Sequence, residues 1–496
     1  MDSIFIGCDI GTSSVKTVGF DEDYNSKFRI AYSYDLISKN KDWAELDPDE
    51  VFKATLNSIK ESLERSEAED LKIEYISFSS ALHSMIAVKT PLEPLSNCLT
   101  WADKRAKKLS RSLEGFYSRK DIYHKTGCPT HAMYMPAKIL WFKKNRGEIF
   151  RQADKFISIK EYILKKLTGR FVVDYSIASG SGLLNIHRKE WEDEILDYLG
   201  IGRRQLSELV DGKKIVNFND KYEEQFGNIP LVVGSGDGPL ANLGELALNT
   251  GQYVATLGSS GAVRTFSTEP VLDNEDQRTW CYMLDDSLYL PGGAINNGGI
   301  VLDWLRKNFC QNGREDFLEN VSNHIKNVPP GSKGIYFMPF LTGERSPNWN
   351  SYAKGIIFGL DYNHTFAEVV KAALEGISFR MCSIKESLED LMGDCDEIIM
   401  NGGVMNSKPW IQLLADVFNT PVKVHENREA SALGAVYLGA VALGYEDRYS
   451  NITNDIDVNY IKRPEESRSQ RYSELYEFHR EIYQKNSELF KKSSTY

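Results

Sequence analysis

The 496-residue sequence is poor in cysteine and histidine, and neither residue occurs in a pattern that binds metal. Its seven cysteines are scattered, are odd in number and include no CxxC pair, which argues against a disulfide framework and against a zinc site. The eight histidines show no ligand spacing either. Scattered reduced thiols are typical of cytoplasmic proteins, so we expect that location.

Two further absences narrow the class of partner. No apolar run approaches the length of a membrane span, and the N-terminal residues are typical of a strand and not of a signal peptide. The net charge is −11, so acidic residues outnumber basic ones. A protein that binds the phosphate backbone of a nucleic acid needs a basic stripe on its surface. We therefore expect neither a membrane nor a nucleic acid as partner. An anionic small substrate remains compatible, because a site can be locally basic on an acidic surface.

What is present is an ordinary globular composition, with 42% hydrophobic and 26% charged residues. The length predicts two or three domains. Apolar strand-like runs alternate with helical patterns, which indicates crossover connections and a largely parallel sheet. The Ser- and Gly-rich stretch Tyr175–Asn185 is predicted as a loop. The oligomeric state is not determined by the sequence, and a homodimer is one assembly left open.

The stretch Gly7–Lys16 predicts a strand, a tight turn and a second strand, because both flanks are rich in β-branched and aromatic residues. Glycine lets the backbone of the turn approach a ligand closely, and the amides and hydroxyls of Thr12 and Ser13 can donate to phosphate oxygens. Asp9, at the strand end, suits a hydrated Mg²⁺. The spacing is neither that of a Walker A loop nor that of GxGxxG. These residues alone are equally compatible with a structural hairpin that binds no ligand.

The same architecture returns at the start of the second half, where residues 252–266 read as a strand, a Gly-Ser turn and a strand. Two domains that each open with a phosphate-cradling hairpin would face each other across a cleft, as in the actin-like (ribonuclease H-like) ATPase fold. We therefore predict an α/β protein with two such domains, over residues 1–245 and 246–445. A mostly helical extension is predicted over residues 446–496.

An ordered set of motifs carries a family resemblance. Gly355–Leu360 followed by Glu368–Glu375 resembles a signature of the FGGY carbohydrate kinases. Further motifs stand in the order expected for that family: Gly7–Lys16, Lys138-Ile-Leu-Trp141, Gly236-Asp237-Gly238, Gly258-Ser-Ser-Gly261, Gly402-Gly403 and Ala432-Leu-Gly434-Ala435. Each motif is weak by itself, but the ordered set is specific, and it covers nearly the whole chain.

The resemblance implies transfer of the γ-phosphate of MgATP to a sugar hydroxyl. Asp237 would be the general base for that hydroxyl, and Asp9 would hold Mg²⁺ through water, with Asp237 beside it. ATP would be bound by Gly11, Thr12, Ser13, Lys16, Gly258, Ser259, Ser260, Gly402, Gly403 and Asn406. The alternative for the Gly-Asp-Gly and Gly-Gly motifs is that they form ordinary turns and bind no ligand.

Substrate choice is predicted from Ser77–Ser84 and Thr100–Ala106, which resemble the gluconate-kinase branch. The xylulose branch usually shows Gln-Met-His-Gly and Trp-Asn-Asp at these places. Gluconate carries a carboxylate, which requires a cation or several donors once it is desolvated. Arg105 and Lys160 are the candidates for that cation, and a solvated helix charge is the alternative for each. The other substrate-binding candidates are His83 as a donor to hydroxyls, Asp103 as an acceptor, Trp101 as a flat apolar face, and Asp237, with His131 and Arg345 as further cleft-lining residues.

The resemblance thus predicts an ATP-dependent kinase that phosphorylates the terminal hydroxyl of gluconate to give 6-phosphogluconate. Binding of both substrates should draw the domains together and exclude water. A kinase for xylulose or another ketose or polyol is the alternative among enzymes. A non-catalytic ATP-binding regulatory protein on the same fold is the alternative from another class, although such a protein has no need of Asp237.

Overall fold

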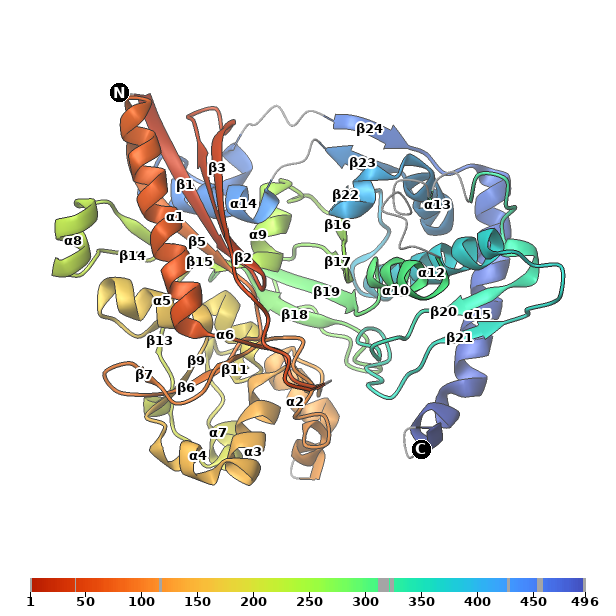
Figure 1. Cartoon of the computed structure of the whole chain (residues 1–496), viewed down its shortest axis with the longest axis horizontal. Coiled ribbons are helices and arrows are strands. Elements are labelled where there is room, and N and C mark those ends of the chain that lie inside the picture. Colours follow the sequence, from red (N-terminus) through yellow and green to blue (C-terminus); the bar gives the residue numbers. More distant parts are fainter. Residues whose placement is uncertain are drawn as a thin grey trace.

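A computed structural model describes residues 2–40, 42–115, 118–310, 321, 325–425, 429–452 and 458–493. Two large mixed β-sheets organise these residues, one in each half of the chain, and helices surround both sheets (Figure 1). The first sheet and its helices occupy one side of the view, and the second sheet, with the long C-terminal helix, occupies the other.

The first sheet has six strands, in the spatial order β14 (Ile215–Val216), β15 (Leu231–Gly236), β5 (Leu71–Ser80), β1 (Asp2–Ile10), β2 (Ser14–Phe20) and β3 (Ser26–Ser33). β1 runs antiparallel to β2 but parallel to β5, and β5 runs parallel to β15. The carboxyl ends of β1, β5 and β15 therefore meet at one edge of the sheet. Asp9 pairs there with Ser79 in register, and Asp237 follows the last residue of β15.

The second sheet has seven strands, in the order β18 (Trp280–Met283), β19 (Tyr289–Ile295), β17 (Gly261–Arg264), β16 (Gln252–Leu257), β22 (Glu397–Asn401), β23 (Val422–His425) and β24 (Val458–Lys462). β16 is antiparallel to β17 and parallel to β22, which is parallel to β23. The run β19-β17-β16-β22-β23 thus repeats the order and the directions of β3-β2-β1-β5-β15. This repeat confirms the predicted use of one architecture in both halves.

Two long helices cover these sheets. α1 (Pro48–Ala68) packs on β2, β3 and β5. Proline stands in its first turn, where no backbone donor is lost, and the Asp47 side chain caps the helix by accepting from the backbone N–H groups of Asp49 and Glu50. α12 (Phe366–Met392) packs on β17, β19 and β20 (Tyr336–Met338) in the core of the second half.

Helices α9 (Asp237–Gly244) and α14 (Ala430–Leu443) pack closely against each other. α14 also lies on β1 and β5, so a late part of the chain is built into the first half (Figure 1). Glycine makes these approaches possible. A Cβ atom on Gly434 would lie 1.9 Å from the carbonyl oxygen of Leu240, and one on Gly7 would lie 2.2 Å from that of Ala432.

The first half carries seven further helices in its described residues: α2 (Arg119–Thr126), α3 (Met135–Asn145), α4 (Gly147–Gln152), α5 (Ile159–Thr168), α6 (Tyr175–Ser181), α7 (Asp193–Leu199) and α8 (Asp220–Phe226). Its short strands are β4 (Glu45–Leu46), β6 (Ile86–Lys89), β7 (Glu93–Pro94), β8 (Cys98–Leu99), β9 (Lys155–Ile157), β10 (Val172–Asp174), β11 (Leu184–Asn185), β12 (Glu190–Trp191) and β13 (Glu208–Val210). The loop predicted over Tyr175–Asn185 is wrong for most of its length, because α6 covers Tyr175–Ser181 and β11 covers Leu184–Asn185. α6 forms there because the Asp174 side chain accepts from the backbone N–H of Ile177 and caps the helix.

The second half adds α10 (Ile300–Phe309), α13 (Lys408–Phe418), α15 (Glu466–Ser493) and the short strand β21 (Ile356–Phe358). α15 runs along the outer side of this half and packs on α13 and α12 (Figure 1). The extension is therefore mostly helical, as predicted, but it also supplies β24 to the edge of the second sheet. Among the helices of the described residues, none is both long and apolar enough to cross a membrane.

Candidate active site

Asp237 lies where two cavities meet. The larger cavity, of about 510 Å³, is lined by residues of both halves, which include Asp9, Lys16, Asp237, Gly402, Gly403 and Asn406. The smaller cavity, of about 300 Å³, is lined among others by His83, Trp101, Asp237, Ser260 and Arg345. Since Asp237 lines both, the structure brings the two predicted carboxylates and about half of the predicted nucleotide- and sugar-binding residues to one crevice.

The backbone around Asp237 is held from several sides. The Gly236 N–H donates to the Ser176 hydroxyl at 3.1 Å, and the Ser235 hydroxyl donates to the Leu284 carbonyl oxygen at 2.9 Å. Gly234 has a φ of +74°, and a Cβ atom there would lie 1.6 Å from the carbonyl oxygen of Phe78. Only glycine fits that approach. The strand end that presents Asp237 is therefore held in place by contacts within the protein.

The protonation of Asp237 depends on burial and on the neighbouring Asp9. Burial, together with the negative charge of Asp9, raises the pKa of Asp237 to about 6. Burial also raises the pKa of Asp9, although its carboxylate accepts from the Ser79 hydroxyl at 2.6 Å. A carboxylate whose pKa lies near neutrality is ionised at pH 7 and still basic enough to take a proton, which is what a general base requires.

Arg264, at the end of β17, is a site residue that the sequence analysis missed. It lines both cavities and donates to the Thr256 hydroxyl. Its positive charge opposes the rise in the pKa of Asp237, and burial lowers its own pKa to about 10. The sequence feature that could have identified it is a single arginine in the otherwise apolar strand after the second Gly-Ser turn.

The predicted phosphate hairpins are present but sit outside the cavities for the most part. Gly11, Thr12 and Ser13 form the turn between β1 and β2, and Gly258 and Ser259 belong to the turn between β16 and β17. None of these five lines either cavity, whereas Ser260 lines the smaller one. Both turns are closed by their own hydrogen bonds, from the Gly11 N–H to the Ser14 carbonyl at 3.0 Å and from the Gly258 N–H to the Ser260 carbonyl at 2.9 Å.

Lys16 lines the larger cavity, but its ammonium group is already paired. It donates to the Glu429 carboxylate at 2.8 Å, and Arg29 donates to the other oxygen of that carboxylate at 2.7 Å. Both partners of Glu429 lie on the first sheet, whereas Glu429 directly precedes α14. The pairing therefore ties the first hairpin to the late part of the chain at the cavity wall.

The far wall of the larger cavity is formed by the second half. Gly402 has a φ of +92°, and a Cβ atom there would lie 2.7 Å from the carbonyl oxygen of Leu257. Beside it, Asn401 donates to the Glu245 carboxylate at 3.2 Å, and the His425 Nδ1 lies 2.7 Å from the same carboxylate. Glu245, Asn401 and His425 all line the cavity and were not predicted.

The smaller cavity has aromatic walls, with Trp101, Trp280 and Tyr282 among its lining residues. The His83 Nδ1 lies 2.6 Å from the carbonyl oxygen of Gly180, and burial lowers the pKa of His83 to about 3, so the ring is neutral at pH 7. Because a carbonyl can only accept, Nδ1 carries the proton and Nε2 is an acceptor. The predicted donation from His83 to a substrate hydroxyl is thus reversed.

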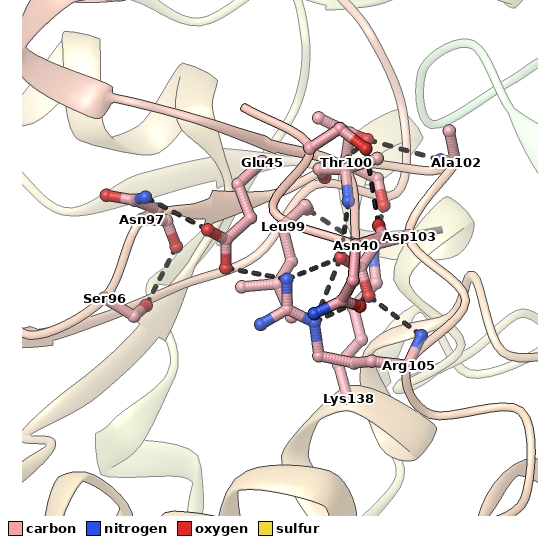
Figure 2. Close-up of polar contacts among 12 residues, drawn as sticks. Asn40, Glu45, Ser96, Asn97, Leu99, Thr100, Ala102, Asp103, Arg105 and Lys138 are labelled. Atoms are coloured by element: carbon pink, nitrogen blue, oxygen red, sulfur yellow. Dashed lines mark hydrogen bonds and ion pairs between the residues drawn. The ribbon is translucent and has the colours of Figure 1, made fainter. Parts of the chain in front are cut away.

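Arg105 and Asp103 lie outside both cavities. The Arg105 guanidinium is 2.6 Å from the carboxylates of both Glu45 and Asp103, and it lies 3.8 Å from the centre of the Trp43 ring. Asp103 also accepts from the Ala44 N–H at 2.9 Å. Figure 2 shows this group, in which each charge is directed at another member. Packing therefore pairs Arg105 and Asp103 with each other and with Glu45, away from the cavity in which we expect the sugar.

Lys160 and His131 are also placed away from the cavity linings. Lys160 is buried against Asp174, at 2.7 Å from its carboxylate. The His131 ring packs on the Trp349 ring, with the ring centres 5.6 Å apart, and burial lowers the pKa of His131 to about 3. Of the predicted cations near the sugar, Arg345 alone lines the smaller cavity.

The carboxylates of the larger cavity fit a hydrated Mg²⁺. Among the described residues no group of three or more His, Cys, Asp or Glu side chains is arranged to hold a metal ion. Mg²⁺ with a nucleotide does not need such a group, because one or two carboxylates, waters and substrate phosphates complete its octahedron. Asp9 and Asp237 in one cavity meet that requirement.

Comparison with known proteins covers both halves. Residues 4–244 match the N-terminal domain of the FGGY family of carbohydrate kinases, and residues 253–443 match its C-terminal domain. A gluconokinase of Bacillus subtilis is 36% identical over 96% of this chain and 94% of its own length. A xylulose kinase of Staphylococcus epidermidis is 26% identical over 98% of this chain and 97% of its own.

Solved structures agree with these matches. The crystal structure of gluconate kinase from Lactobacillus acidophilus superposes with a TM-score of 0.93 at 32% identity, over 99% of this chain and 100% of that one. A ligand-bound xylulose kinase from the same organism gives 0.92 at 32% identity, over 99% of both chains. The matches extend over both sheets and the crevice between them, and the chain therefore belongs to the FGGY family of carbohydrate kinases.

Proposed function

We propose that the protein transfers the γ-phosphate of MgATP to the terminal hydroxyl of gluconate, giving 6-phosphogluconate. The observation that carries this proposal is the position of Asp237 in the linings of both cavities. A sugar in the smaller cavity and a nucleotide in the larger one would meet at its carboxylate.

Asp237 acts as the general base. Its pKa of about 6 leaves it ionised at neutral pH, and it takes the proton of the terminal hydroxyl as that oxygen bonds to the γ-phosphorus and ADP departs. Arg264, which lines both cavities beside Asp237, offsets the negative charge of the transferring phosphoryl group. Mg²⁺ held by Asp9, through water, and by Asp237 would neutralise charge on the phosphate oxygens of ATP.

ATP occupies the larger cavity and extends along the hairpins. Gly402, Gly403 and Asn406 line the wall against which the nucleoside lies. Lys16 and the two hairpin turns contact the phosphates, through Gly11, Thr12 and Ser13 on one side and Gly258, Ser259 and Ser260 on the other. Several amides and hydroxyls at a glycine-rich turn provide such contacts.

Gluconate is favoured over xylulose by the sequence comparison. Two gluconokinases, from Bacillus subtilis and Bacillus licheniformis, are 36% identical to this chain, whereas the xylulose kinase of Staphylococcus epidermidis is 26% identical. The Lactobacillus acidophilus structures do not favour either substrate, because the gluconate kinase and the xylulose kinase are both 32% identical to this chain. A kinase for xylulose or another ketose or polyol is therefore the second candidate.

A coupled assay of ADP release tests the proposal. The purified protein is given MgATP with gluconate, xylulose, ribulose, glycerol or no sugar. We expect turnover with gluconate that exceeds turnover with each other sugar by at least about tenfold in kcat/KM. If the protein prefers xylulose or another uncharged sugar, that sugar and not gluconate is its substrate. ADP release that no sugar stimulates would contradict sugar phosphorylation altogether.

A further inference from the structure

Arg345 is a buried cation without an acidic partner. Its side chain lines the smaller cavity, and the residue is 8% exposed. One guanidinium nitrogen donates to the carbonyl oxygen of Ile295 at 3.0 Å, while its Nε has no hydrogen-bond partner. Among the described residues, no carboxylate lies within ion-pair distance of it. Burial lowers its pKa to about 10.

Of the other cations near the sugar, two face a carboxylate and a third donates only to backbone carbonyls. Arg264 faces the charge of Asp237, and Lys160 is paired with Asp174. Lys138 donates to the backbone carbonyls of His83 and Thr100. Leaving a buried charge unpaired is costly, because desolvation is not offset by an ion pair. The imbalance at Arg345 therefore points to a missing anion, and the cavity beside it is where that anion can enter.

We propose that Arg345 binds the carboxylate of the sugar acid and so selects gluconate over uncharged sugars; this rests on the proposed function. The planar guanidinium presents donors in a fork that matches a carboxylate. The Trp101 ring lies 5.1 Å from the guanidinium carbon and restricts its orientation by stacking. An uncharged sugar in the same cavity leaves the buried charge unbalanced.

This assignment also explains which hydroxyl is phosphorylated. The carboxylate of gluconate and its terminal hydroxyl are at opposite ends of one six-carbon chain. Arg345 and Asp237 both line the cavity, and each attracts a different end, since one is a cation and the other a hydrogen-bond acceptor. Holding the carboxylate at Arg345 therefore leaves the hydroxyl-bearing part of the chain to the base, which fits the proposed transfer to the terminal hydroxyl. Specificity for the acid and the site of phosphorylation follow from the same contact.

The test compares gluconate with glucitol, which has a CH₂OH group in place of the carboxylate. Binding is measured without nucleotide through tryptophan fluorescence, and kcat/KM through ADP release, for the wild type, Arg345→Met and Arg345→Lys. Arg111→Met, at an exposed position, is the matched control. We expect Arg345→Met to weaken gluconate binding by about 100-fold and to leave glucitol binding within about threefold of the wild type. Arg345→Lys should lose less, because it keeps the charge but not the fork.

Equal loss of both ligands in Arg345→Met, or unchanged binding of gluconate, would overturn the assignment while leaving gluconate kinase activity of the wild type intact. A wild type that does not prefer gluconate over glucitol would instead reject the proposed function, and the assignment with it. If Arg345→Met does not fold, as judged by thermal unfolding and ATP binding, Arg345→Lys decides. A selective loss for gluconate of about tenfold supports the assignment, and an equal loss rejects it.

Discussion

The ammonium group of Lys160 lies 2.7 Å from the carboxylate of Asp174 and 3.1 Å from the carbonyl oxygen of Ser235. Asp174 caps α6, and Ser176 of that helix accepts from the Gly236 N–H. Lys160 on α5 is therefore joined to the start of α6 and to the end of β15. We interpret it as a residue that positions the strand end before Asp237.

Lys160→Met should consequently reduce stability and slow turnover with every sugar alike. Removing the ammonium leaves Asp174 buried without its partner, which costs about 3–5 kcal/mol. Denaturant unfolding measures the loss of free energy, and ADP release with gluconate and glucitol measures turnover. The double variant Lys160→Met/Asp174→Asn should recover part of the stability, since the stranded charge is gone. A loss confined to gluconate would show that Lys160 reaches the substrate carboxylate after all.

Asp237→Asn should abolish catalysis and spare nucleotide binding. The amide keeps the shape of the side chain but cannot take the hydroxyl proton, so kcat should fall by about 10²–10⁴-fold. ATP affinity, measured by calorimetry without Mg²⁺, should stay within about threefold, because the glycine wall and Lys16 are unchanged. Asp23→Asn, at an exposed turn position, serves as the control and should be fully active. A variant that retained most of its turnover would remove Asp237 from the role of base.

Glu161→Gln should stabilise the protein increasingly as the pH rises from about 4.5 to about 7. Burial raises the pKa of Glu161 to about 7, above its ordinary value of 4.5. Between these values the folded state binds the extra proton, so the contribution of Glu161 to stability falls as the pH rises and stays lost above pH 7. The deficit is on the order of 3 kcal/mol.

Glutamine carries no charge and can still accept from the Ser158 N–H, as Glu161 does at 2.6 Å. The difference in unfolding free energy between Glu161→Gln and the wild type should therefore be largest near pH 8 and vanish toward pH 4.5. Denaturant unfolding across this range measures it. A difference that is the same at every pH would show that the carboxyl group is not titrating in this window.

Glu429→Gln should tighten ATP binding. Lys16 is paired with Glu429, so the phosphates of ATP must compete with this carboxylate for its ammonium group. Both side chains are partly exposed, which limits the gain to about twofold to fivefold and makes it decrease with salt. Arg29→Gln is the matched control, because it removes the other partner of Glu429 and leaves the pair with Lys16 intact. Weaker ATP binding by Glu429→Gln would indicate that Glu429 itself supports the nucleotide.

The sequence allowed the two repeated hairpins to be predicted because their signals are local. Apolar β-branched runs interrupted by glycine define strand and turn without knowledge of the rest of the chain. Asp9 and Asp237 could be placed together because each follows a strand of a parallel sheet, and such strand ends meet at one edge. The helix α6 was missed because the capping side chain of Asp174 outweighs the Ser and Gly content that follows it.

The charged residues of the sugar site could not be assigned from the sequence. Arg105, Lys160 and Arg345 are each single basic residues, and whether such a residue is paired depends on what the fold brings to it. Glu45 and Asp103 reach Arg105, and Asp174 reaches Lys160, whereas no carboxylate of the described residues reaches Arg345. The distinction lies in tertiary contacts between segments that are far apart along the chain.

The close seating of α14 on the first sheet has a consequence for dissecting the protein. A fragment that ends near residue 245 would contain β1 and β5 without the helix that covers them, and apolar side chains such as Tyr75, which is fully buried, would face water. Such a fragment should be insoluble unless residues 430–443 are supplied, either as a separate peptide or by fusion. The catalytic halves are thus interlocked pieces, and neither is an independent module.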